Sequence, residues 1–189
     1  MSRRYIVLFL LLAAVALASG WFLDRLDTEP PERAEGARQR PDYYVENFTA
    51  TTLDLTGFPT RRLDAAYMAH YPETDTHELA DPYLVLFAEL ATPWHVRSER
   101  GWISPDGDEM LLLGKVHIWR NDESGERQVD IRTEDLRVLP VTEYGETDER
   151  VVITTPSSES RGVGMRAWMG KGRLELLSQV RTVYERPAR

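Results

Sequence analysis

Residues 110–133 read MLLLGKVHIWRNDESGERQVDIRT, and this stretch decides the fold. Val116 and Ile118 alternate with polar or aromatic neighbours, and Val129 and Ile131 alternate with charged ones. A period of two is typical of a strand with one face in a core. The intervening Asn121–Gly125 is rich in turn-forming residues, so the stretch predicts two strands joined by a hairpin.

The same strand-and-turn pattern recurs from Tyr43 onward, without a long helical segment after the N-terminal region. The C-terminal Leu174–Glu185 alternates in the same way. Short strands at near-regular spacing predict an all-β sandwich, roll or open barrel. Leu111–Leu113 is apolar on both faces, which predicts a central strand packed on two sides.

The N-terminal region predicts a membrane anchor. Residues 5–23 carry no charge, and at about 1.5 Å per residue they just reach across a bilayer core. Arg3 and Arg4 in front of them predict that residues 1–4 stay in the cytoplasm and that the rest is exported. Ala16–Ala18 also has the form of a signal-peptide cleavage site, but the apolar run continues past it, which favours a retained helix.

Residues 24–42 predict a linker between this helix and a folded domain at 43–189, because they hold three prolines, many charges and no apolar periodicity. The helix itself is rich in alanine. These small residues either permit close packing against another membrane helix or are neutral filler in a simple tether.

Composition excludes several functions. The chain has no cysteine, so disulfides and thiolate metal sites are excluded. The formal net charge of −8 argues against a nucleic-acid partner, since phosphate contacts require a basic surface. If the domain binds an anionic lipid, it should do so chiefly through the apolar part.

No nucleophile–base pattern or phosphate-binding loop is present, so we expect no catalysis and no cofactor. His70–Glu78 contains two histidines and three acids, a composition that metal sites share. Pro72 prevents a regular helix there, and a polar turn without metal is the preferred interpretation.

A series of short motifs runs through the exported region. It comprises His70-Tyr71-Pro72, Trp94-x-Val96, Leu112-x-Gly114-x-Val116, Thr133-x-x-Leu136, Thr147-Asp148-x-x-Val151, Gly162-x-Gly164-Met165 and Gly172-x-Leu174-x-Leu176-x-x-Val180-Arg181-x-x-Tyr184. With the preceding anchor, this series resembles the LptC family, a single-pass inner-membrane subunit of the lipopolysaccharide export system of Gram-negative bacteria.

The resemblance implies an open, twisted periplasmic β-jellyroll whose apolar groove takes lipid A acyl chains. It also implies three partners: lipopolysaccharide, the inner-membrane ABC transporter and a periplasmic bridge protein. The transporter would meet the membrane helix and the membrane-proximal edge of the jellyroll. The bridge protein would meet the C-terminal edge. A structural adaptor that docks jellyrolls without carrying lipid remains an alternative.

Two sets of site residues follow from the alternation and the resemblance together. The groove candidates are Phe48, Leu63, Leu79, Leu84, Leu86, Val96, Leu112, Val116, Ile131, Met165, Leu174, Leu176, Val180 and Tyr184. The candidates for the docking edge are Gly162, Gly164, Leu174, Val180, Arg181 and Tyr184. The tryptophans 94, 102, 119 and 168 either line a lipid cleft or are structural.

Overall fold

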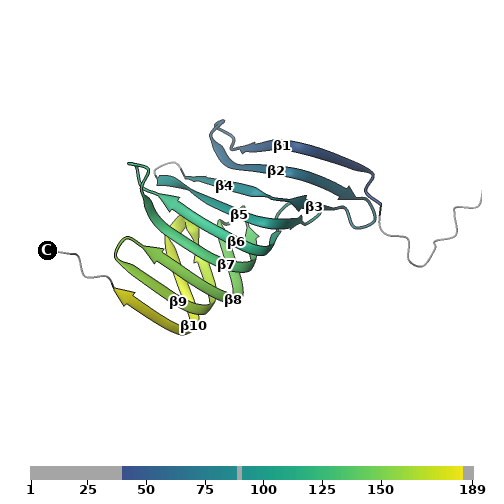
Figure 1. Cartoon of the computed structure of the whole chain (residues 1–189). Helices are drawn as coiled ribbons and strands as arrows, with labels where there is room; N and C mark the ends of the chain where they lie inside the picture. The colour runs from purple at the N-terminus through teal and green to yellow at the C-terminus, as the bar shows by residue number, and fades with distance from the viewer. Residues whose placement is uncertain (1–39, 89–90, 185–189) are drawn as a thin grey trace, which may run out of the picture. The chain divides into compact units, whose positions relative to one another are not determined.

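The computed structural model describes residues 40–88 and 91–184, which form one antiparallel sheet (Figure 1). Its strands are β1 (Tyr43–Leu53), β2 (Pro59–Tyr71), β3 (Thr76–Ala80), β4 (Tyr83–Ala88), β5 (Ala91–Ile103), β6 (Met110–Asn121), β7 (Arg127–Leu139), β8 (Tyr144–Thr155), β9 (Ser158–Trp168) and β10 (Arg173–Tyr184). A 3-10 turn, η1 (Met169–Lys171), precedes β10. The all-β prediction is confirmed.

The described residues contain no helix long and apolar enough to span a bilayer. The predicted membrane helix at 5–23 and nearly all of the predicted linker at 24–42 lie outside them.

Sequence neighbours are sheet neighbours along most of the sheet. The order is β1-β2-β3-β5-β6-β7-β8-β9-β10, with β4 paired to both β2 and β5. The predicted β6–β7 hairpin is present. Its turn is fixed by Asp122, whose Oδ1 accepts the N–H groups of Ser124 at 2.9 Å and Glu126 at 3.0 Å.

Bulges interrupt the strand pairing at matching positions along the sheet. The pairing register shifts between Leu112 and Lys115 in β6, between Thr147 and Arg150 in β8, and between Ser178 and Arg181 in β10. Left-handed backbone accompanies these shifts at Gly114, Asp135, Gly164 and Gln179. Bulges bend a strand, and these bulges lie side by side across the sheet. We call the row that they form the bend line.

The bend line divides β5–β10 into two halves. The first half contains 91–98 of β5, 115–121 of β6, 127–134 of β7, 150–155 of β8, 158–163 of β9 and 181–184 of β10. The second half contains 100–103, 110–113, 136–139, 144–147, 165–168 and 173–178. Residues from both halves, such as Ile118 and Met165, share one core cluster, so the halves pack against each other through their inner faces.

The prediction that 111–113 is packed on two sides is wrong. Leu112 is buried in the core, whereas Leu111 and Leu113 lie half-buried on the outer face. They line a hollow there with Arg100 and Trp102 of β5. Their partial cover thus comes from neighbouring strands of the same sheet.

Candidate functional site

An apolar cavity of 190 Å³ lies between the two halves of the sheet. The first half contributes Trp94, Ile118, Val129, Ile131 and Ile153 to its wall. The second half contributes Leu136, Met165, Ala167 and Leu174, and Met169 of η1 adds to that side. None of the carboxylates in 40–88 and 91–184 lines the cavity. The alternation that buries one face of each strand therefore leaves a space that suits apolar ligand chains.

One side of the cavity ends in a stacked pair from β5 and β6. Trp94 and Arg120 are opposite each other in the β5–β6 ladder, and the guanidinium carbon of Arg120 lies 4.8 Å from the Trp94 ring centre. The Nε of Arg120 donates to Oε1 of Gln128 at 3.0 Å. A ring and an amide thus hold a cation at the wall of an apolar cavity.

A second such pair lies on the other half of the sheet. The guanidinium carbon of Arg173 is 5.1 Å from the ring centre of Trp168, its partner in the β9–β10 ladder. Arg173 differs from Arg120 because it is ion-paired with Glu175. Its charge is therefore already met by a carboxylate.

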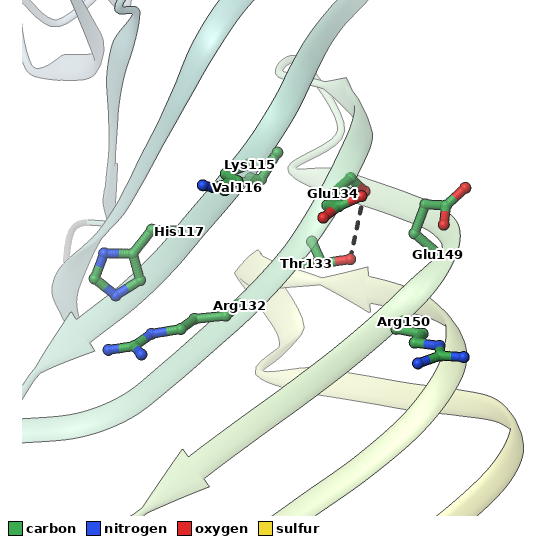
Figure 2. Close-up of a pocket in the computed structure, with 8 residues that line it drawn as sticks. All are labelled: Lys115, Val116, His117, Arg132, Thr133, Glu134, Glu149 and Arg150. Carbon is green, nitrogen blue, oxygen red and sulfur yellow. Dashed lines mark hydrogen bonds between the residues drawn. The ribbon is translucent and has the colours of Figure 1, made fainter.

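A larger hollow of 690 Å³ lies over β6, β7 and β8 at the bend line (Figure 2). Its lining mixes cations, including Lys115 and Arg150, with Glu134 and Glu149. Lys115 and Glu134 are opposite each other in the ladder, so their charges offset locally. This hollow, lined mainly by charged residues, does not suit acyl chains.

The groove candidates divide into a buried group, a partly buried group and an exposed pair. Leu79, Leu84, Leu86, Val96, Leu112, Val116, Ile131 and Met165 are buried in the core cluster. Phe48, Leu63, Leu174 and Leu176 are partly buried and packed against it. Ile131, Met165 and Leu174 line the cavity itself. The lipid contacts assigned to this set remain a prediction.

Val180 and Tyr184 do not lie in the core, contrary to expectation: they are 54% and 78% exposed. The bulge at Gln179 carries β10 past the bend line, where it pairs with Ser158–Arg161 of β9. The inner face there carries serine rather than large apolar side chains. Within the part of the chain that the structure describes, Ser158–Arg161 of β9 offer no large apolar side chain to cover the end of β10.

The docking-edge set also needs correction. Gly162 and Gly164 are buried on β9, which is paired on both sides, so neither lies at an edge. A Cβ at Gly162 would meet Leu176 at 3.3 Å, and one at Gly164 would meet Leu177 at 2.9 Å. These glycines permit close approach of β10. Val180, Arg181 and Tyr184 are exposed on β10, the terminal strand of the sheet.

The two histidines of 70–78 are cross-strand neighbours of β2 and β3. The ring nitrogens of His70 lie 2.7 Å from Asp42 Oδ1 and 2.9 Å from Asp75 Oδ1. These two hydrogen bonds raise the pKa of His70, that to Asp75 most. Burial lowers the pKa of His77. Within 40–88 and 91–184, no cluster of three or more side chains is arranged to hold a metal.

Comparison with known proteins assigns the family. The family described as "Lipopolysaccharide-assembly, LptC-related" matches residues 9–185. The chain belongs to this LptC-related family. The lipopolysaccharide export system proteins LptC of Escherichia coli (strain K12) and Shigella flexneri are each 24% identical to it over 186 residues, which cover 97% of this chain and 94% of theirs.

A solved structure shares the fold. LptH of Pseudomonas aeruginosa is described as the LptA-homologous periplasmic component of the lipopolysaccharide transport device. It matches with a TM-score of 0.50 and 5% identity, over 67% of this chain and 95% of its own. The chain thus shares its sheet architecture with this protein at negligible sequence identity.

Sequence reasoning missed much of the cavity wall. Ile118, Leu136 and Ile153 line it but were not among the groove candidates. Arg120 was also missed, because a charged residue at the end of a strand gives no signal of its own. Its position opposite Trp94 in a hairpin ladder was the only signal available.

Proposed function

We propose that the chain carries lipopolysaccharide through the periplasm, with acyl chains held in the cavity between the two halves of the sheet. The observation that supports this proposal most strongly is the cavity itself. Apolar side chains from both halves line it, and the described residues contribute no carboxylate to it. Each CH₂ group that moves from water into it contributes roughly 0.8 kcal/mol. Family membership and the LptA-like fold support the choice of ligand.

The volume of the cavity limits how much of the ligand it can hold. At 190 Å³ it is smaller than the roughly 300–1,000 Å³ of typical ligand pockets. It suits part of one acyl chain in this closed form. Binding of several chains therefore requires the two halves of the sheet to move apart at the bend line.

The remaining parts of the proposal place the chain in its system. Residues 5–23 anchor it in the inner membrane, and the domain lies in the periplasm. The helix and the membrane-proximal edge of the sheet meet the ABC transporter, which supplies the energy. The β10 edge meets the bridge protein, and the chain acts as a carrier rather than an enzyme.

Photo-crosslinking tests the ligand site. A photoreactive side chain at Leu174 should form an adduct with lipopolysaccharide, because Leu174 lines the cavity. The same side chain at Tyr184, which is 78% exposed, is the matched control on the same strand. Equal adduct yields at the two positions, or none at Leu174, would reject the cavity and favour the adaptor alternative.

A further inference from the structure

Arg120 is the cation of the cavity wall whose charge is not met by a carboxylate. Among 40–88 and 91–184, no acidic oxygen lies within 4.0 Å of its guanidinium nitrogens. The chain is acidic, with a formal net charge of −8, so a carboxylate partner for Arg120 is not lacking for want of acidic residues. A half-buried arginine without a carboxylate partner indicates a site for an anion that a ligand supplies.

The side chain is also held in place. Trp94 covers one face of the guanidinium at 4.8 Å, and Gln128 accepts from Nε at 3.0 Å. Neither contact uses the terminal Nη atoms. A planar guanidinium fixed in this way can donate two parallel hydrogen bonds to a phosphate oxygen pair, at little further cost in side-chain entropy.

The surroundings of Arg120 change from apolar to polar across the sheet. Arg120 is opposite Val129, and Thr155 of β8 is opposite Ser158 of β9. The hydroxyls of Thr155 and Ser158 are 2.8 Å apart, as are those of Ser160 and Thr182. We call these hydroxyl residues the polar rim. Since neighbouring strands are about 4.8 Å apart, the rim lies beside the apolar floor of the cavity, which includes Ile118 and Ile131.

We propose that Arg120 binds a phosphate on the headgroup of the amphiphile whose acyl chains occupy the cavity, while the polar rim faces its sugars. This inference rests on the proposed function and adds a headgroup site to it. The apolar floor binds chains without regard to charge. Arg120 makes the cavity selective for phosphorylated amphiphiles and fixes which end of the molecule lies at the rim.

The test uses the full-length chain in nanodiscs of zwitterionic phospholipid, with a photoreactive side chain at Leu174. Adduct yield is measured against the concentration of diphosphorylated lipid A and of the same lipid stripped of phosphate. Arg120→Gln should weaken labelling by the phosphorylated lipid about ten- to a hundred-fold. Labelling by the dephosphorylated lipid should stay the same. Arg132→Gln, an outer-face change at a side chain 75% exposed, should alter neither.

Three results separate the possible failures. Equal effects of Arg120→Gln on both lipids, or no effect on either, would overturn the headgroup site while leaving the cavity intact. No labelling of the unaltered chain by either lipid would overturn the proposed function itself. Inorganic phosphate that blocks labelling when present at the same concentration as the phosphorylated lipid would overturn the proposal, because the site would then bind free anions independently of acyl chains.

Discussion

The hydroxyl of Thr147 donates a hydrogen bond to the main-chain oxygen of Glu134 across a distance of 2.9 Å. It does so where the β7–β8 ladder is interrupted between the pairs Arg132–Val152 and Arg137–Glu146. A buried side chain thus replaces a missing ladder bond at the bend line. The outer hollow of Figure 2 lies over the same interruption, with Glu134 in its lining.

Replacement of Thr147 by valine should destabilise the domain by about 1–3 kcal/mol, because it removes the 2.9 Å donor to the Glu134 oxygen and the side-chain acceptor of the Glu149 N–H. The free energy of unfolding in urea measures the effect. Thr154→Val is the matched control, since Thr154 is exposed on the same strand. If the two variants lose equal stability, the bond from Thr147 does not close the gap in the ladder.

Two features of position 164 require glycine: the left-handed backbone conformation and the close approach of Leu177. Its φ is +77°, and a Cβ there would lie 2.9 Å from Cδ1 of Leu177. Gly164→Ala should therefore cost more than Gly125→Ala, whose φ of +90° is similar but whose Cβ would meet nothing within 4 Å. We expect the excess to be about 1–3 kcal/mol of unfolding free energy. A Leu177→Ala change should remove most of it, and an excess that survives this change would contradict the contact.

His70 gives stability a dependence on pH. Hydrogen bonds to Asp75 and Asp42 raise its pKa above the ordinary 6.5, and the folded state therefore holds its proton more tightly than the unfolded state. The stabilisation is fully present below pH 6.5 and is lost as pH rises through the raised pKa. Because both carboxylates are largely exposed, the effect should be small.

The neighbouring His77 changes stability with pH in the opposite direction, so its contribution must be removed to isolate that of His70. Burial and the charge of His70 lower its pKa, so stability falls as pH drops below 6.5. We predict that in a His77→Gln background the unfolding free energy declines as pH rises above 6.5 through the raised pKa of His70, and that His70→Gln removes this decline. An identical pH profile with glutamine at position 70 would show that the His70 contacts do not form in solution.

The proposed docking edge can be tested without removing β10. Deletion of 173–189 would also remove Leu174 and Leu176, which pack on the core. The double substitution Val180→Glu and Val183→Glu tests the edge alone, because both side chains are 54% exposed and do not pack in the core. We expect these changes to abolish pull-down of the bridge protein while leaving stability within about 0.5 kcal/mol. Leu53→Glu, on the strand at the other end of the sheet, should retain binding; loss with Leu53→Glu alone would move the interface to β1.

Alternation along the chain was enough to predict the strands and most of the core. Val96, Leu112 and Ile131 have the period of two that a half-buried strand requires, and each is almost fully buried. The β6–β7 turn was equally predictable, because Asp122 and Gly125 have local roles that need no tertiary contact.

The bend line was not predictable in the same way. Its positive-φ positions include Asp135 and Gln179, residues that do not mark a bulge by themselves. Each bulge changes which neighbours a strand meets, and this placed Val180 and Tyr184 outside the core. The cavity depends on two halves that meet only after all the bends have formed, so its wall could not be assembled from single strands.

The central claim is that acyl chains occupy the cavity, and a cavity-filling substitution tests it most directly. Ala167 lines the cavity, while its neighbour Arg166 is exposed on the opposite face of β9. Native mass spectrometry of the full-length chain can count lipopolysaccharide bound to Ala167→Phe and to Arg166→Phe. We predict that Ala167→Phe loses most of the bound lipid and that Arg166→Phe retains it. Equal occupancy in two folded variants would contradict the account.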